Sequence, residues 1–244
     1  MGKPISSRQN PLFQRIRDAI REHAGEIVIE GPKQVADALR AGWKPIALVE
    51  GGGQTILSVL ERQAGLPVVH FSNELFDQLA DTRAPQNVLA LFERPRGDAN
   101  AILARRDTVA IALDAVQDPG NVGTIVRLAA AFDAAGVLLL PGCADPFGPK
   151  AIRASAGAIL NVPVANIDRL SHANLVYADM HGEAIDPPAR DAVLVFGNEG
   201  AGVSAKIRKA ARAIAIPMSD RVESLNVASS AAILLARSYA ARVK

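Results

Sequence analysis

The chain has 244 residues, of which 49% are hydrophobic and 21% are charged, and its formal net charge is +2. This balance excludes a disordered chain, and the lack of a long uncharged apolar stretch excludes a membrane-spanning helix. A single cysteine, Cys143, excludes an internal disulfide, and four scattered histidines lack the partners of a metal site, so we predict a cytoplasmic protein without a metal.

The N-terminal part of the chain alternates between helices and strands. Its first residues are too polar for a secretory signal and lead into an amphipathic helix over about 10–24, with Leu12, Phe13, Ile16 and Ile20 on one face. Strands are then expected at 26–31, 44–52, 66–72 and 86–94, and helices at 32–42, 55–65 and 73–81. These patterns predict a small α/β domain over residues 1–95.

A segment rich in arginine, proline and glycine follows, with the sequence "ERPRGDANAILARRD" at 93–107. It interrupts the apolar pattern, so we interpret residues 96–106 as a linker between two domains. Its arginines could contact RNA phosphates, although a solvated linker is the simpler explanation; they are Arg94, Arg96, Arg105 and Arg106.

The alternation resumes over residues 107–244. Strands are expected at 108–116, 136–140, 161–167, 174–179, 192–197 and 213–218, and helices at 123–134, 149–159 and 225–243. The strands are apolar on both faces, which is typical of a parallel sheet covered by helices on both sides. Ligands bind such sheets beyond the carboxyl ends of the strands.

Three of these strand ends carry polar sequence: "DPGNVGTIVR" at 118–127, "GNEGAGVS" at 197–204 and "PMSDRVESLN" at 217–226. The second turn differs from a dinucleotide-binding loop because Glu199 occupies a position that would face a pyrophosphate, and no phosphate-loop lysine follows. NAD and ATP are therefore disfavoured. A cationic or neutral nucleoside cofactor fits better, and S-adenosylmethionine is the obvious one.

The first and third turns each allow a simpler interpretation. A helix N-terminus with Asn121 and Arg127 nearby suits an RNA phosphate, but Asn121 would also serve as a plain N-cap and Arg127 as an exposed helix residue. In the third turn, Ser224 and Asn226 can donate and accept hydrogen bonds, but Ser224 would also serve as an ordinary helix cap. Three such turns in one sheet favour a shared binding site.

The three turns, in this order, resemble the motifs of the SpoU (TrmH-type) RNA ribose 2′-O-methyltransferases of the SPOUT superfamily. In the N-terminal part, "ISSRQNPLFQRI" and "IVIEGPKQVADAL" resemble the small substrate-binding domain that many members carry. The resemblance implies a knotted parallel-sheet catalytic domain, an N-terminal α/β domain of the kind found in a ribosomal protein, and a homodimer built on the catalytic domain. It also implies S-adenosylmethionine as methyl donor and RNA as substrate.

The resemblance also assigns roles to residues. Asn121 and Arg127 would lie at the reacting ribose and its phosphate, and Glu199 would support the active site, with Ser224 and Asn226 as the polar pair of the third motif. The methyl donor would be held by the remaining matched positions, which are Gly197, Ile216, Met218 and Leu225, together with Asn226.

Three questions stay open at this point. A guanidinium is effectively always protonated, so we expect Arg127 to orient the phosphate while the proton leaves by another route. By family analogy alone, ribosomal RNA is favoured over transfer RNA as substrate. Three functions other than ribose methylation stay as alternatives: methylation of a base, RNA binding without catalysis, and a Rossmann oxidoreductase. Glu199 disfavours the last of them.

Overall fold

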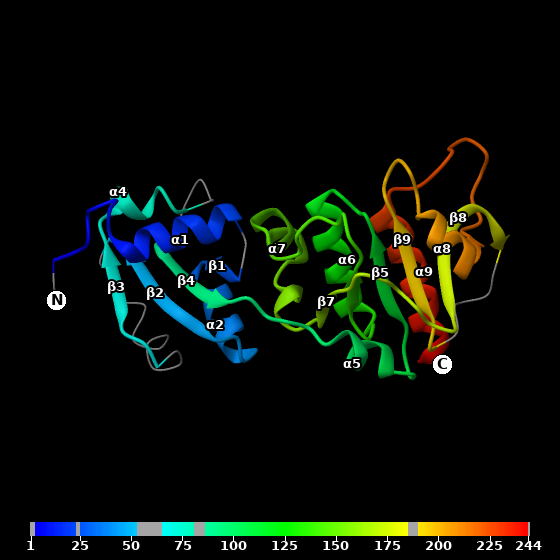
Figure 1. Ribbon diagram of the computed structural model, residues 1–244, viewed down its shortest axis with the longest axis horizontal. Helices are drawn as coiled ribbons and strands as arrows, with labels where there is room; N and C mark the ends of the chain where they lie inside the picture. The colour runs from blue at the N-terminus through cyan, green and yellow to red at the C-terminus, as the bar shows by residue number, and fades with distance from the viewer. Residues whose placement is uncertain (1–2, 23–24, 53–64, 81–85, 185–189, 244) are drawn as a thin grey trace. The chain divides into compact units, whose positions relative to one another are not determined.

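A computed structural model describes residues 3–22, 25–52, 65–80, 86–184 and 190–243 (Figure 1). The chain divides into two compact units. The first contains Met1–Pro95 with Phe147–Pro149, and the second contains Arg96–Pro146 with Lys150–Lys244. Each unit has its own sheet and its own apolar core.

The first unit is built on a four-stranded sheet in the order β1-β4-β2-β3. Strand β4 is antiparallel to both β1 and β2, whereas β2 and β3 are parallel. Helix α1 buries Phe13 and Ile16 against this sheet, as its amphipathic pattern predicts. The elements are α1 (Pro11–Glu22), β1 (Glu26–Glu30), α2 (Pro32–Arg40), β2 (Pro45–Gly51), β3 (Val68–Phe71), α4 (Asn73–Phe76) and β4 (Val88–Glu93).

Two expected helices of this unit have different outcomes. The helix expected at 73–81 is shorter, because α4 ends at Phe76 and continues only as turns to Leu79. The helix expected at 55–65 falls almost entirely on residues outside the described ranges.

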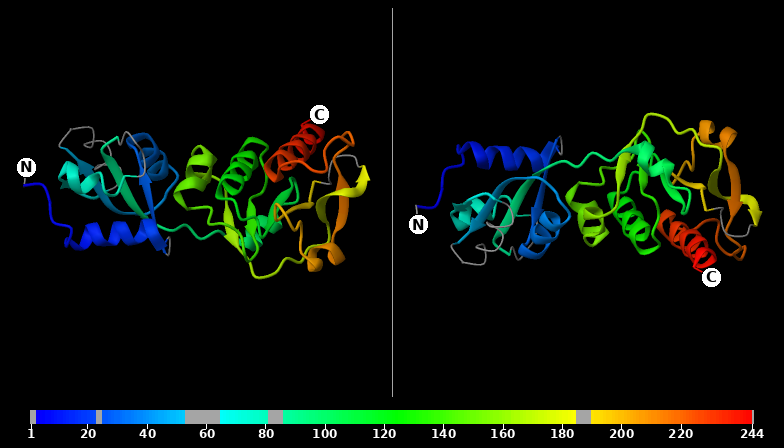
Figure 2. Two further views of the ribbon diagram at one scale, coloured as in Figure 1. Left: turned by 90° about the horizontal axis from the view of Figure 1, so that it is seen from above. Right: turned by 90° about the horizontal axis from the view of Figure 1, so that it is seen from below.

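The second unit is built on a six-stranded parallel sheet in the order β10-β8-β9-β5-β6-β7. Figure 2 shows α6 and α9 side by side on one face and α5 and α8 on the other. The predicted parallel sheet covered on both sides is therefore confirmed. Its strands are β5 (Ala110–Asp114), β6 (Val137–Leu139), β7 (Val164–Asn166), β8 (Leu175–Ala184), β9 (Val193–Gly197) and β10 (Arg212–Ala215). Its helices are α5 (Ala99–Ala104), α6 (Pro119–Ala131), α7 (Pro149–Ser155), α8 (Ala205–Ala210) and α9 (Val227–Arg242).

Several boundaries of this unit differ from expectation for local reasons. The helix expected at 149–159 is shorter, because α7 ends at Ser155, where Ala156 and Gly157 have φ values of 50° and 85°. A short 3-10 helix at Ala158–Leu160 follows in place of its last turn. Helix α8 was not predicted. The segment interpreted as a linker contains α5, which Asp98 caps and which buries Ile102 in the core of this unit.

The described part of the chain contains neither a candidate membrane-spanning helix nor a candidate metal site. None of its helices is long and apolar enough to cross a membrane, and it holds no group of three His, Cys, Asp or Glu side chains placed to bind a metal. Cys143 is half-buried, and burial raises the pKa of its thiol, which disfavours the reactive thiolate.

Candidate active site

The first polar turn joins β5 to α6, and Asp118 rather than Asn121 caps the helix. The Asp118 Oδ1 atom accepts a hydrogen bond from Gly120 N at 2.7 Å and lies 2.8 Å from Lys150 Nζ. The Lys150 ammonium and the Gly120 amide lower the pKa of Asp118. The alternative that Asn121 is a plain N-cap is therefore wrong, because Asn121 lies inside the first turn and its side chain is available for other contacts.

The second polar turn is a loop that follows β9 and is shaped by Asn198. The side chain of Asn198 accepts hydrogen bonds from Gly200 N at 3.0 Å and Ala201 N at 2.9 Å, and its amide donates to Ala115 O at 2.9 Å. Residues 198 and 202 are also paired through their backbones. A single side chain thus closes this loop and attaches it to the turn after β5.

Gly197 is required where β9 runs into this loop. A Cβ atom at this position would lie 2.2 Å from the carbonyl carbon of Gly202 and 2.3 Å from Val203 N. No side chain fits within such distances of a backbone, so the close approach of the loop to the strand depends on glycine.

Glu199 connects the first two turns. Its Oε1 atom accepts hydrogen bonds from Asn121 Nδ2 at 2.9 Å and Asp118 N at 3.3 Å, and its Oε2 atom accepts one from Gln117 N at 3.3 Å. Partial burial raises the pKa of Glu199, but these hydrogen bonds outweigh it, so the net pKa is lowered and the group is a stable carboxylate. The N-terminus of α6 therefore faces two carboxylates, which disfavours the phosphate expected there.

The third polar turn ends at Asn226, which caps α9. Its Oδ1 atom accepts hydrogen bonds from Ala228 N at 2.9 Å and Ser229 N at 3.3 Å. Its Nδ2 group donates to Asn121 Oδ1 at 3.1 Å. The alternative that Ser224 caps this helix is wrong. Glu199, Asn121 and Asn226 instead form one network that joins all three turns.

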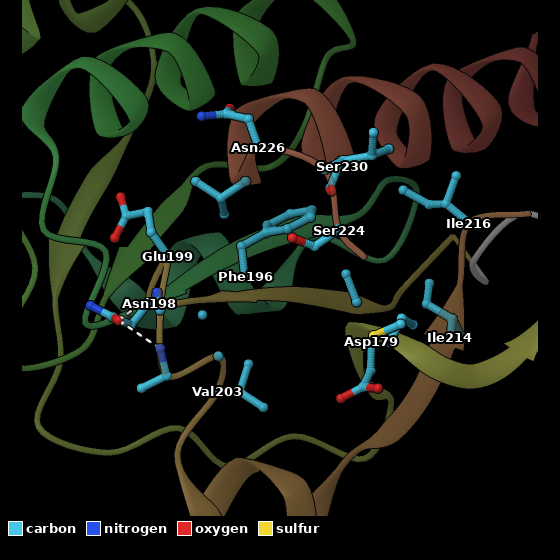
Figure 3. A pocket seen from close by; sticks show the side chains of 18 of the residues that line it. Asp179, Phe196, Asn198, Glu199, Val203, Ile214, Ile216, Ser224, Asn226 and Ser230 are labelled. Carbon is cyan, nitrogen blue, oxygen red and sulfur yellow. Dashed lines mark hydrogen bonds between the residues drawn. The ribbon is translucent and has the colours of Figure 1, made fainter. Parts of the chain in front are cut away.

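A cavity of about 520 Å³ lies beside this network (Figure 3). Its walls come from the middle of β8, the end of β9 with the following loop, the end of β10 with the following residues, and the start of α9. Seven of the nine predicted site residues line it, which are Gly197, Glu199, Ile216, Met218, Ser224, Leu225 and Asn226. Asn121 is joined to this group through its hydrogen bonds to Glu199 and Asn226.

Arg127 lies apart from the cavity lining. It is exposed on α6, six residues after Asn121, and at 3.6 residues per turn the two side chains leave the helix on different faces. No hydrogen bond or ion pair holds its guanidinium within the described residues. The structure therefore groups eight of the nine predicted residues and leaves Arg127 as an exposed cation without an ion-pair partner among the described residues.

Sequence reasoning missed three contributors to the site. Asp114, buried at the end of β5, accepts a hydrogen bond from Ser204 N at 2.6 Å and so holds the second loop from its far end. Asn198 closes that loop, and Asp179 on β8 lines the cavity. No polar turn directly follows Asp179, so the pattern of strand ends gave no signal for it.

The comparisons with known proteins cover both units. Residues 108–236 match the SpoU rRNA Methylase family, and residues 13–90 match the MRM3-like substrate binding domain. The 23S rRNA (guanosine(2553)-2'-O)-methyltransferase RlmP of Bacillus subtilis is 31% identical over 96% of this chain and 98% of its own length. The chain belongs to the SpoU rRNA methylase family.

Solved structures of similar proteins extend this likeness to the whole fold. The AdoMet-bound rRNA methyltransferase of Sinorhizobium meliloti has a TM-score of 0.85 and 29% identity over 98% of both chains. The SpoU methyltransferase AviRb of Streptomyces viridochromogenes, in complex with AdoMet, has a TM-score of 0.85 and 26% identity over 97% of this chain and 99% of its own. The likeness to these SpoU methyltransferases therefore extends over both units of the chain.

Proposed function

We propose that this SpoU protein transfers a methyl group from S-adenosylmethionine to a ribose 2′-hydroxyl of 23S ribosomal RNA. The observation that carries the proposal is the network of Glu199, Asn121 and Asn226 beside a cavity large enough for a nucleoside cofactor. Two relatives support the substrate: RlmP modifies a guanosine, and a Streptomyces viridochromogenes relative, 28% identical, is a 23S rRNA (uridine(2479)-2'-O)-methyltransferase. Both names give the 2'-O position of the ribose as the methylated atom, but they differ in the base of the modified nucleoside.

The lining of the cavity fits S-adenosylmethionine, which supplies an activated methyl group on a sulfonium centre. Because Gly197 has no side chain, its backbone N–H and C=O groups are not covered at the cavity wall. Apolar walls for a nucleoside come from Ile216, Met218 and Leu225. Asn226 adds an amide at the rim. The described lining includes two carboxylates and neither lysine nor arginine, so it suits a cationic donor and disfavours a phosphorylated nucleotide.

Glu199 acts in this proposal by positioning other groups. Both of its carboxylate oxygens already accept hydrogen bonds from the protein, and its lowered pKa makes it a poor proton acceptor. Glu199 fixes the orientation of the Asn121 amide by accepting a hydrogen bond from its Nδ2 group. The Oδ1 atom of Asn121 then accepts a hydrogen bond from Asn226 Nδ2. Asn121, Asn226 and the Ser224 hydroxyl would then orient the ribose hydroxyl toward the donor, and much of the rate enhancement comes from this orientation.

Arg127 would bind a phosphate of the RNA. Its exposure and the lack of an ion-pair partner within the described residues leave its guanidinium available to an anion. Because a guanidinium keeps its proton, we infer that Arg127 does not accept the ribose proton. A pH–rate profile of Arg127→Lys tests this point: full activity with a shifted optimum would restore the role of base to this residue.

The homodimer implied by the family resemblance belongs to this proposal. Helix α9 carries apolar residues on several faces, and two of them, Ile233 and Ala236, are only half-buried within the chain, which is typical of a helix covered from a second side. Light scattering over a range of concentrations would detect the dimer.

Selection of the RNA would belong to the first unit, which matches a substrate-binding domain, together with the linker arginines. A cytoplasmic location stays a prediction.

Methyl transfer from radiolabelled S-adenosylmethionine to separated 23S, 16S and transfer RNA tests the substrate. We expect label in unmodified 23S RNA, and a reduction of about tenfold or more with Arg127→Ala, which is the size expected for the loss of a charge-assisted hydrogen bond. Because Arg127 is an exposed residue, this variant should keep its stability within about 0.5 kcal/mol. Label in transfer RNA alone would contradict the proposed substrate.

A further inference from the structure

The wall of the cavity formed by the middle of β8 contains a carboxylate that none of the three motifs includes. Asp179 lines the cavity and is half-buried. Its Oδ1 atom accepts a hydrogen bond from His181 N at 2.9 Å. Its other oxygen has no hydrogen-bond partner within the described residues. A half-buried carboxylate of this kind favours a cationic partner.

The described lining of the cavity has His181 as its one basic side chain and provides no ammonium or guanidinium group. Asp179 and Glu199 are its two acidic residues, and the described lining has no lysine or arginine. The Glu199 oxygens are already engaged by Asn121 and by two backbone amides. Asp179 is therefore the carboxylate with an oxygen left for a bound molecule, and its charge favours a ligand with a positive group.

The two carboxylates lie on different sides of the cavity. Figure 3 shows Glu199 and Asn226 on one side and Asp179 beside Ile214 on the other. In the proposed function, the methyl group must reach the side of Glu199, Asn121 and Asn226. The sulfonium carries that methyl group and cannot donate a hydrogen bond. The ammonium of the donor's amino-acid portion can donate hydrogen bonds and is separated from the sulfur by several bonds.

We propose that Asp179 binds the α-ammonium group of S-adenosylmethionine and thereby makes the cavity selective for a donor with an intact amino-acid portion. This inference rests on the proposed function, since it requires that S-adenosylmethionine occupies the cavity. Asp179 is a donor-binding residue in this account and takes no part in removing the ribose proton.

Calorimetric binding to the full chain tests the proposal with three ligands. They are S-adenosylmethionine, S-adenosylhomocysteine, and the deamino analogue of S-adenosylhomocysteine, which lacks only the ammonium. Asp179→Asn keeps the acceptor for His181 N and nearly the same shape, so the fold should persist. Asp168→Asn, an exposed site outside the cavity lining, is the control for the change in charge.

The expected result is a loss of about tenfold or more in the affinity of Asp179→Asn for both amino-acid ligands, by the same factor, with the deamino analogue unaffected. In methyl transfer, KM for S-adenosylmethionine should rise by a similar factor while kcat changes little. Asp168→Asn should match the unaltered protein in both measurements.

Three other results would overturn the inference. An equal loss for the deamino analogue would mean that Asp179 contacts the adenosine portion, and a loss for S-adenosylmethionine alone would mean that it faces the sulfonium. No change with any ligand would mean that Asp179 binds none of these groups. If the unaltered protein bound neither S-adenosylmethionine nor S-adenosylhomocysteine, the proposed function itself would fail, which is a distinguishable outcome.

Discussion

The replacement of Glu199 by glutamine removes one hydrogen-bond acceptor from the centre of the site without changing its size. Three donors converge on this carboxylate: Asn121 Nδ2 at 2.9 Å, and Asp118 N and Gln117 N at 3.3 Å. A glutamine side chain offers one oxygen and one amide nitrogen. If its oxygen keeps the contacts with Asn121 and Asp118, its nitrogen faces the N–H group of Gln117, and that hydrogen bond is lost.

The cost of the substitution follows from two changes. The hydrogen bond from Gln117 is lost, and those from Asn121 and Asp118 then go to a neutral oxygen instead of a charged one. Hydrogen bonds to charged groups contribute about 1.5–3 kcal/mol, against about 0.5–1.5 kcal/mol for neutral pairs. Glu199 is only partly buried and stays exposed to solvent, which reduces these figures through solvent screening. A net cost of about 1–2 kcal/mol lowers kcat/KM by about 5- to 30-fold, at about 1.4 kcal/mol for each factor of ten.

Initial rates of methyl transfer to 23S RNA measure this loss, with Glu223→Gln as a control of equal charge change in the exposed segment before α9. Rates for Glu199→Gln equal to those of the control would refute the argument that the network positions Asn121. A loss of about a thousandfold or more with a displaced acidic limb would also refute it, because that size is typical of a group that transfers a proton.

Three further predictions concern the loop after β9. Gly197→Ala places a Cβ atom 2.2 Å from the Gly202 backbone, so donor affinity and melting temperature should both fall, whereas Gly200→Ala, whose nearest neighbour would be 3.7 Å away, should leave both nearly unchanged in calorimetry. Asn198→Ala removes three hydrogen bonds and should lower the free energy of unfolding by about 2 kcal/mol in urea titrations. Because the pKa of Glu199 is lowered from 4.5, its stabilising contribution is present above that pH and is lost as the pH falls through the folded-state value. Donor affinity should accordingly stay level from about pH 7, where the donor's α-amino group is mostly protonated, down to about pH 5.5, and an acidic limb within that range would contradict the lowered pKa.

The central sheet and the meeting of the three turns were predictable from local sequence. Strands such as β5 and β9 are apolar on both faces, and polar residues at their carboxyl ends must meet at one edge of a parallel sheet. Asn121, Glu199 and Asn226 therefore came together as expected. The knotted path of the chain was expected only through the family resemblance, since general rules of chain connection disfavour knots.

The remaining features depend on contacts between distant parts of the chain. Ser224 and Asn226 are both good caps, and only the start of α9 at Val227 decides between them. Asn198 bonds to Ala115, 83 residues away in the sequence, so its role has no local signature. Asp179 sits within a strand that runs beyond its expected end, and no pattern in the sequence shows that its side chain faces the cavity.

The position of the transferred methyl group tests the central claim most directly. Unmodified 23S RNA would be incubated with the protein and S-adenosylmethionine, digested to nucleosides and analysed by mass spectrometry, with Asn121→Ala as the matched variant. The account predicts one new nucleoside methylated on its ribose, at a level strongly reduced by the variant. A nucleoside methylated on its base would contradict the assignment of the reaction, even with the fold and the donor unchanged.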